Sequence, residues 1–328
     1  MRILYLPNSY SQQRQHEKKA NIYPVRMAME AEWYRKQGYE VFWHISDKSS
    51  QTKHFANTNK LKVIYEPENL PFLTLPRPDR VFTRAKEYSS GNYKYLPGTH
   101  IMSASGCWHG KCTFCIENGK PYEVREIDDV LSEILECELL GFRDIFDDSG
   151  TFPVGSWLHE FCENIINEDW MLHLGCNMRI TKEVDFKQMK QAGFRMLLFG
   201  VESANQETLD RIGKGVRVDD IIPTIKRAAK EGLEPHIAVM FGYSWENDEQ
   251  SIATLRLVHY LLRKGYAKTA QASFYTTKDG ANESQRKYVR RIYEAAYYPN
   301  FWFQQLSGIH NIADIKYLWL KIKKGLGR

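Results

Sequence analysis

The sequence predicts an α/β protein whose main part is an open, partial (β/α)6 barrel, with a small β-α-β unit before it and a helical tail after it. Strand-like and helix-like runs alternate six times after residue 98, and a glycine follows four of the helices. Alternation of this kind pairs strands in parallel through right-handed crossovers, which curl the chain into a barrel. Six repeats are two short of the closed barrel of eight.

The first 45 residues are predicted to form one β-α-β unit. Arg2–Leu6 is a short apolar strand, Pro24–Gln37 carries apolar residues at helical spacing, Gly38 ends that helix, and Glu40–His44 is a second strand. Residues 46–98 are rich in Asn, Pro, Lys and Thr, and their prolines interrupt any regular element. We expect a connector here, with one strand at Lys62–Tyr65.

The barrel repeats follow as alternating runs. The expected strands are His100–Ala104, Asp144–Phe146, Met171–Gly175, Met196–Gly200, His236–Phe241 and Ala270–Tyr275. The expected helices are Ile127–Leu140, Ser156–Asn167, Asp185–Ala192, Asn205–Ile212 with Asp219–Glu231, and Glu249–Lys264. A left-handed cap is predicted at the glycine after each of four helices, namely Gly141, Gly193, Gly232 and Gly265.

The tail is predicted to hold a Tyr- and Arg-rich helix over Glu283–Tyr298 and a basic amphipathic helix over Asp314–Lys324. The second helix either caps the barrel or contacts a membrane surface or RNA. The chain is therefore predicted to divide into three parts. Residues 1–95 form a truncated Rossmann-like unit with its linker, residues 96–280 form the barrel, and residues 281–328 form the helical tail.

Composition and charge restrict the class of protein. Hydrophobic residues make up 43% and charged residues 26% of 328, as in globular proteins, and 45 Lys+Arg against 40 Asp+Glu give a net charge of only +5. No apolar run approaches the ~18 residues of a membrane span, and the amino terminus lacks the apolar core of a signal peptide. We therefore expect a cytoplasmic protein with no membrane span and no nucleic-acid partner.

Three of the six cysteines lie within nine positions, as Cys107-x4-Cys112-x2-Cys115 in the loop after the first barrel strand. Soft thiolates on one short loop select zinc or an iron–sulfur cluster, and Gly106 and Gly110 allow the backbone to wrap closely around either. Three ligands for a four-iron cluster leave one iron open for chemistry. The alternative is a zinc site with His109 as fourth ligand, although zinc sites usually combine two separated ligand pairs.

These cysteines, placed after the first strand of a six-repeat β/α series, resemble the radical S-adenosylmethionine (radical SAM) superfamily. The resemblance covers residues 99–280 and is closest to the cobalamin-associated branch. It rests on further runs that follow the later strands: Ile145–Phe152, Asn177–Arg179, Gly200–Ser203, Glu207–Gly215 and Phe241–Ile252. In the last run, Ser-Trp replaces the branch's Pro-Gly.

The resemblance implies a [4Fe-4S] cluster held by the three cysteines, with the amine and carboxylate of SAM on the fourth iron. An electron from the cluster would cleave SAM to methionine and a 5′-deoxyadenosyl radical, which abstracts a substrate hydrogen atom. The SAM-binding residues it implies are Phe114 and Met240–Gly242 at the adenine, Glu202, Ser203 and Arg179 at the amine, carboxylate or ribose, and Asp148 near the methionine end. Such groups gather where the carboxyl ends of parallel strands meet.

The chain departs from that pattern in two places. The family's usual spacing is C-x3-C-x2-C, so one extra residue lies between Cys107 and Cys112. The cobalamin-associated branch carries a full Rossmann-like domain at the amino terminus, whereas residues 1–95 resemble only the start of that domain and the linker after it. A corrin ring needs a large concave pocket, so we do not expect this chain to bind cobalamin.

The remaining cysteines are Cys137 and Cys162, expected as buried residues in helices, and Cys176, expected after the third strand. Cys176 is either a packed core cysteine or a thiol at the barrel mouth that donates a hydrogen atom to a substrate radical. No second cluster is predicted.

Four functional hypotheses follow from the sequence. The first is a radical SAM enzyme that acts on a small molecule or peptide and takes electrons from a donor such as flavodoxin or ferredoxin; methyl transfer, cyclisation, rearrangement and epimerisation stay open. The second is a cobalamin-dependent radical SAM methyltransferase. The third is a non-catalytic iron–sulfur or zinc binding module, and the fourth is a radical SAM enzyme that acts on RNA, suggested by the basic tail helix.

Overall fold

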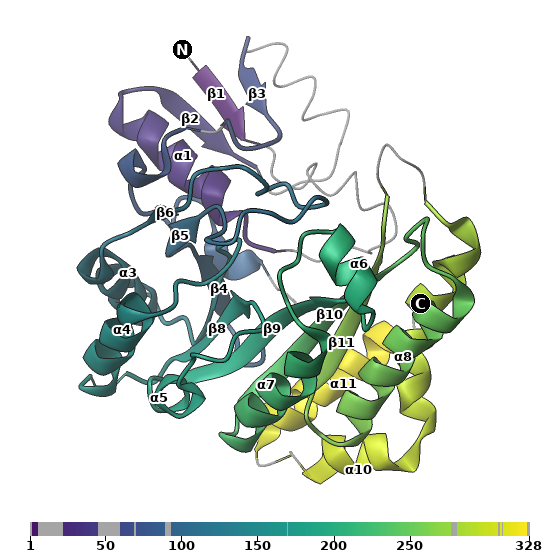
Figure 1. The fold of residues 1–328 in the computed structure, drawn as a ribbon. Helices are drawn as coiled ribbons and strands as arrows, with labels where there is room; N and C mark the ends of the chain where they lie inside the picture. Colours follow the sequence, from purple (N-terminus) through teal and green to yellow (C-terminus); the bar gives the residue numbers. More distant parts are fainter. Residues whose placement is uncertain are drawn as a thin grey trace. The chain divides into compact units, whose positions relative to one another are not determined.

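The computed structural model describes residues 2–5, 22–44, 60–68, 70–88, 93–168, 170–276, 281–307, 309 and 311–326 (Figure 1). Leu6 and residues 46–59, 69 and 89–92 of the predicted connector lie outside these residues. Packing groups the chain into two compact units: unit 1 is Met1–Ser105 with Glu123–Asp148, and unit 2 is Gly106–Tyr122 with Ser149–Arg328. The divisions predicted at residues 95 and 280 stay predictions. Within the described ranges, no helix has the length and apolar character needed to cross a membrane.

Unit 1 begins with the predicted β-α-β unit. Strands β1 (Arg2–Tyr5), β2 (Glu40–Trp43) and β3 (Lys62–Ile64) form a parallel sheet in the order β2-β1-β3. Helix α1 (Val25–Lys36) packs on β2, and its buried Met27, Ala31 and Tyr34 share a core with apolar side chains of β1 and β3. The buried side chains of such short parallel strands need a helix to cover them. Helix α1 covers them here, so the small sheet forms where the sequence predicts it.

The rest of unit 1 holds the first two barrel strands. Strand β4 (Gly98–Ile101) pairs in parallel with β7 (Asp144–Asp147), and helix α3 (Ile127–Leu139) connects them. Two short 3-10 helices lie in the segment before β4, η2 (Phe72–Thr74) and η3 (Ala85–Glu87). In chain order, unit 1 therefore supplies two of the six strand–helix repeats of the partial barrel.

A fully buried carboxylate holds α3 in unit 1. Glu133 accepts hydrogen bonds from Arg80 at 2.6 Å and from Arg125 at 2.5 Å, and all three side chains are almost completely inaccessible to solvent. Burial alone would raise the pKa of Glu133, but the two guanidinium groups outweigh it and hold the pKa below its ordinary value. Two arginines on one buried carboxylate make this network a strong structural constraint.

We expect Glu133→Gln to lower the free energy of unfolding by about 3 kcal/mol, because it removes the carboxylate that pairs with the buried Arg80 guanidinium, while Arg125 keeps its ion pair with Asp129 at 2.7 Å. The exposed pair of Arg84 and Glu87 provides a matched control, and Glu87→Gln should cost less than about 1 kcal/mol. Because the pKa of Glu133 is lowered in the folded state, its contribution is present above the unfolded pKa and is lost as the pH falls through the folded pKa. Urea unfolding at neutral and acidic pH measures both effects, and equal costs for the two variants would contradict the prediction.

Unit 2 supplies the other four repeats. Its strands pair in parallel in the order β8-β9-β10-β11: β8 (His173–Met178), β9 (Phe194–Glu202), β10 (Glu234–Phe241) and β11 (Thr269–Phe274). The helices between and before them are α4 (Ser156–Ile166), α5 (Phe186–Gln191), α6 (Gln206–Arg211), α7 (Val218–Lys230) and α8 (Asp248–Arg263). In chain order, β4 and β7 of unit 1 precede these four strands, which gives the six strands of the predicted partial (β/α)6 barrel.

The predicted helix caps and tail are present with one correction. Gly141, Gly193, Gly232 and Gly265 all have positive φ. The tail contains η4 (Glu283–Gln285), α9 (Arg286–Arg291), η5 (Ile292–Tyr297), α10 (Pro299–Ser307) and α11 (Ile312–Leu326). The single helix predicted over Glu283–Tyr298 is therefore wrong. Its carbonyl oxygens accept hydrogen bonds from other parts of unit 2, Arg291 O from His259 and Ala296 O from Trp302, and these bonds compete with a continuous helix.

Two predicted strands are also corrected. The run His100–Ala104 breaks after Ile101, because Asp147 accepts hydrogen bonds from both the amide and the hydroxyl of Ser103, at 2.8 and 2.6 Å. Ala104 and Ser105 instead form β5 (Ala104–Ser105), antiparallel to β6 (Glu123–Val124). Strand β8 starts two residues later than predicted and continues to Met178, since its pairing with the long β9 extends that far.

Candidate functional site

The three predicted cluster ligands lie on one loop of unit 2. Cys112 is buried, and Cys107 and Cys115 are half-buried. A tight turn joins the last two, with the Cys115 amide donating to Cys112 O at 3.1 Å, and Gly106 lets the loop pass so close to Pro121 that an added Cβ would lie 2.3 Å from its carbonyl oxygen. We call residues 106–122 the cluster loop.

The environment of the sulfur atoms fits an electron-rich cluster. The Glu117 amide donates to Cys115 Sγ at 3.4 Å, and the guanidinium of Arg179 lies 3.8 Å from Cys112 Sγ. Burial raises the pKa of Cys115, and the neighbouring Cys112, Glu117 and Cys107 raise it further, as expected where thiols are gathered together. Amide and cationic donors that point at sulfur tune iron–sulfur clusters.

The arrangement differs from that of a single-ion site. Among the residues that the structure describes, no three His, Cys, Asp or Glu side chains converge as the ligands of one metal ion do. His109, the alternative zinc ligand, is hydrogen-bonded through Nε2 to Gly213 O at 2.7 Å. Each cysteine of a four-iron cluster binds a different iron, so such ligands do not converge on one point.

Arg179, which follows β8, connects the cluster loop to the rest of the site. Its guanidinium donates to Lys214 O and lies over the ring of Trp108, with 5.1 Å between Cζ and the ring centroid. Arg179 Nε is buried and has no hydrogen-bond partner among the described residues. A buried N–H group of this kind usually has a partner, so this atom is a candidate to donate to a bound ligand.

Glu202, the last residue of β9, forms a buried ion pair with Lys214, at 2.8 Å between Oε1 and Nζ. Glu202 has φ +65°, a left-handed conformation that costs energy for a residue with a side chain and is concentrated at functional sites. Gly200 makes room for the pair, because a Cβ there would lie 2.6 Å from Glu202 Oε1 and 2.8 Å from Lys214 Nζ. Sequence reasoning did not assign a role to Lys214, although its position between two glycines in the Glu207–Gly215 run was a signal.

Ser203 follows Glu202 but faces a different partner. Its hydroxyl donates to Glu246 Oε1 at 2.8 Å, and that buried carboxylate also accepts from Thr208 at 2.6 Å and Asn205 at 3.0 Å. The hydroxyl of Ser203 thus holds the turn after β10 against the turn after β9. Its predicted role toward SAM stays a prediction, and Glu246 is a site-supporting residue that sequence reasoning quoted without singling out.

The predicted adenine-binding segment, Met240–Gly242, lies at the carboxyl end of β10. Met240 is half-buried, and Gly242 has φ +102° and lies against Phe274, whose ring would be 2.4 Å from an added Cβ. The buried side chain of Gln285, in the tail, accepts from the Gly242 amide at 2.9 Å and donates to Glu246 O at 2.5 Å. Sequence reasoning missed Gln285, because nothing local marks a tail residue as the partner of a barrel turn.

The other predicted site residues lie as follows. Phe114 is half-buried in the cluster loop beside Cys115. Asp148 is exposed and belongs to unit 1, and its role near the methionine end of SAM stays a prediction. Cys176 lies inside β8 and is fully buried, so the prediction that it follows the third strand is wrong, because that strand extends to Met178. Cys137 and Cys162 are buried in helices as expected.

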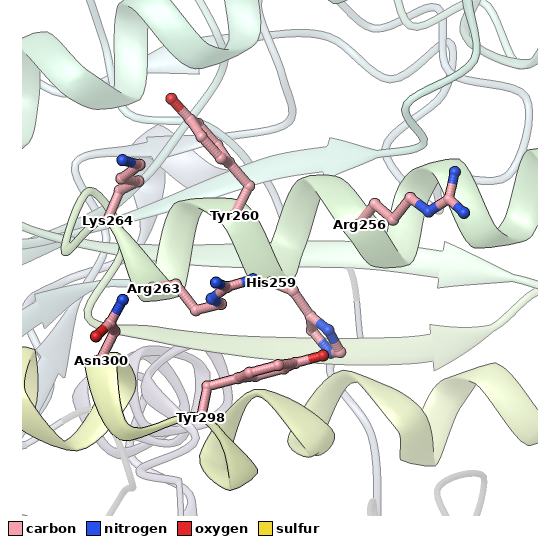
Figure 2. Close-up of a pocket in the computed structure, with 7 residues that line it drawn as sticks. All are labelled: Arg256, His259, Tyr260, Arg263, Lys264, Tyr298 and Asn300. Atoms are coloured by element: carbon pink, nitrogen blue, oxygen red, sulfur yellow. The ribbon is translucent and has the colours of Figure 1, made fainter.

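A separate pocket of about 320 Å³ contains none of these residues (Figure 2). It lies between α8 and the tail and is lined by Arg256, His259, Tyr260, Arg263, Lys264, Tyr298 and Asn300. Figure 2 shows Arg263 beside Tyr298, and the guanidinium carbon lies 4.4 Å from the ring centroid. This pocket therefore does not coincide with the predicted site.

The chain is similar to known proteins over part of its length. Residues 101–258 match the model of the Radical SAM superfamily. An uncharacterized methyltransferase of Pyrococcus horikoshii is 28% identical over 175 residues, which cover 51% of this chain and 38% of that protein. An anaerobic magnesium-protoporphyrin IX monomethyl ester cyclase of Rubrivivax gelatinosus is 23% identical over 282 residues, 78% of this chain and 49% of that protein. The chain thus spans less than half the length of either relative.

Among solved structures, the radical S-adenosylmethionine methyltransferase TsrM of Kitasatospora setae, with tryptophan substrate and the SAM analog aza-SAM bound, has a TM-score of 0.50. It is 17% identical and covers 63% of this chain and 39% of its own. This likeness shows the fold, a partial (β/α) barrel. The residues that match the Radical SAM family model, 101–258, also contain the motifs that follow successive strands.

Proposed function

We propose that this protein is a radical SAM enzyme that cleaves S-adenosylmethionine reductively and abstracts a hydrogen atom from its substrate. The observation that carries the proposal is the arrangement in unit 2. Three cysteines on one loop, with a guanidinium and an amide directed at their sulfur atoms, lie beside a buried Glu202–Lys214 pair at the end of β9.

The family's cofactors are a [4Fe-4S] cluster and SAM, and Cys107, Cys112 and Cys115 would hold the cluster. When bound, the reduced cluster supplies the electron that splits SAM into methionine and the 5′-deoxyadenosyl radical. The remaining groups of the site would bind SAM and orient it. Lys214 and Arg179 Nε offer hydrogen-bond donors to a carboxylate, and Glu202 offers an acceptor to an amine.

The backbone after β10 has a second role in this proposal. Met240 to Gly242 would form the edge against which the adenine lies, and Phe114 would contact its face. Gln285 keeps this edge in place, because it binds both the Gly242 amide and Glu246 O from the tail. Groups preset in this way need no rearrangement when the ligand arrives.

The reaction after hydrogen abstraction stays open among methyl transfer, cyclisation, rearrangement and epimerisation. The similarity to an uncharacterized methyltransferase is compatible with methyl transfer, and a cobalamin-dependent methyltransferase is the alternative function. Our expectation that the chain does not bind cobalamin is not confirmed and stays a prediction. It rests on the small amino-terminal sheet of unit 1, which has three strands in the described residues.

Radical SAM enzymes need a reductant and a substrate. We propose an acceptor of small-molecule or peptide type and a flavodoxin- or ferredoxin-type electron donor, in keeping with the predicted cytoplasmic location. The predicted hydrogen-donor role of Cys176 is retained only as a proposal, since that side chain is fully buried.

The test is anaerobic reconstitution with iron and sulfide, followed by dithionite and SAM, with 5′-deoxyadenosine measured by chromatography. We expect 5′-deoxyadenosine to form only with reconstituted protein. Zinc in place of iron in protein purified anaerobically would contradict the proposal and favour a binding module. Incubation of the same protein with hydroxocobalamin, followed by gel filtration, should leave the protein without corrinoid absorbance, and stoichiometric retention would establish the cobalamin alternative.

A further inference from the structure

His109 occupies the four-residue gap of the cysteine motif and makes a specific contact outside the cluster loop. Its Nε2 lies 2.7 Å from Gly213 O. A carbonyl oxygen can only accept, so Nε2 must carry the proton of this hydrogen bond. The imidazole also covers Gly215, where an added Cβ would lie 2.7 Å from His109 Cε1.

The segment Gly213–Gly215, which His109 contacts, lets its backbone lie close to the cluster loop. Gly213 and Gly215 have φ +64° and +63°, and a Cβ on Gly213 would lie 2.5 Å from Lys111 O. Side chains larger than hydrogen are excluded at both positions by conformation and by space. The two glycines therefore allow the backbone around Lys214 to lie directly against the cluster loop.

Lys214, between these glycines, belongs to the other half of the site. Its ammonium group pairs with Glu202 at 2.8 Å, and its carbonyl oxygen accepts from Arg179, which in turn lies 3.8 Å from Cys112 Sγ. The cluster loop has two further contacts with this segment: the Thr113 amide donates to Ile212 O at 2.9 Å, and Cys112 Sγ lies 3.9 Å from Gly213 O. Among the side chains that the structure describes, His109 makes the shortest hydrogen bond from the cluster loop to the segment.

We propose that His109 is a positioning residue, which fastens the cluster loop to Gly213 and thereby holds Lys214 and Glu202 in place for SAM. Gly110, with φ +56°, turns the chain immediately after His109. The inference rests on the proposed function, and it assigns to His109 a role other than zinc ligation.

The test compares His109→Ala, His109→Gln and His109→Phe in reconstituted protein. Iron and sulfide content should stay at the wild-type level in all three, since the three cysteines are retained. The SAM dissociation constant should rise about 10-fold in the Ala and Phe variants, because the Gly213 carbonyl loses its donor. The Gln variant, whose amide can donate to the same oxygen, should recover most of the affinity. Among the three variants, only His109→Gln should show the wild-type change in the electron paramagnetic resonance spectrum of the reduced cluster when SAM is added.

His159 is a suitable control, because it is an exposed histidine of unit 2 that is hydrogen-bonded to Gln188 at 3.0 Å, and His159→Ala should change none of these readouts. Loss of iron in all three His109 variants would overturn the proposal in favour of ligation. Unchanged SAM affinity and spectra would overturn it as well.

A readout without SAM separates this inference from the proposed function. Amide hydrogen exchange of protein without cofactor, followed by mass spectrometry, should be faster over residues 112–114 and 212–216 in His109→Ala than in wild type. If wild-type protein fails to form 5′-deoxyadenosine but this difference is found, the proposed function fails and the His109 contact stands. Identical exchange would overturn the contact itself.

Discussion

Replacing Cys107, Cys112 and Cys115 together by alanine should remove all iron and sulfide from reconstituted protein, against about four of each per chain in wild type. No other set of cysteines in the described residues can substitute, because Cys137, Cys162 and Cys176 are each fully buried. Production of 5′-deoxyadenosine should fall to the level of protein that was never reconstituted. Iron and sulfide analysis, the absorbance of the cluster and the 5′-deoxyadenosine assay measure the three effects.

The matched control is Cys137→Ala with Cys162→Ala, which also removes cysteines but leaves the cluster loop intact. Both side chains are buried in helices, so this variant should lose stability while keeping its iron content. A triple variant that keeps its iron and its cluster absorbance would show that the cluster lies elsewhere in the chain.

The second large effect is expected at the Glu202–Lys214 pair. Glu202→Gln alone would leave the Lys214 ammonium group buried without a counter-charge, which is costly for folding. The informative variant is therefore Glu202→Gln combined with Lys214→Met, which removes both charges and keeps the side-chain volumes. It should raise the SAM dissociation constant about 100-fold, since charge-assisted hydrogen bonds to a ligand contribute about 1.5–3 kcal/mol each. Equilibrium dialysis of labelled SAM against reconstituted protein measures the change.

Glu234 provides the comparison for that experiment. It pairs with Arg195 at 2.8 Å, but at the amino ends of β10 and β9, whereas Glu202 ends β9 at its carboxyl terminus. Glu234→Gln with Arg195→Met should leave SAM affinity and iron content as in wild type. Equal losses of affinity in the two double variants would indicate a general weakening of the fold and would remove Glu202 and Lys214 from the SAM site.

The proposed site depends on the ends of three strands and on two segments that are distant in sequence. Arg179 and Gly242 directly follow β8 and β10, and Glu202 ends β9, the arrangement that parallel strands impose on their carboxyl ends. The Gly213–Gly215 segment and Gln285 add contacts from beyond the strands, one against the cluster loop and one against Gly242. Changes at these supporting residues should therefore affect SAM binding without touching a cluster ligand.

Much of the fold was predictable because the relevant signals are local. Apolar periodicity places α3, α4, α7 and α8 within one residue of their observed limits, and the cap glycines mark where helices end, since only glycine takes a left-handed conformation without cost. The predicted strands failed where a distant side chain intervened. Asp147 ends β4 by binding Ser103, 44 residues away, and pairing with β9 sets the limits of β8.

By itself, the sequence determined the six strand–helix repeats, the three clustered cysteines and the polar residues that follow successive strands, because spacing along the chain is sufficient for each. Only the tertiary structure decided which side chains meet. It paired Glu202 with Lys214, placed His109 on Gly213, and enclosed Cys176 inside β8. A hydrogen bond or an ion pair depends on the distance between two atoms in space. For residues that turns and loops bring together, that distance is set by the packing of the whole unit.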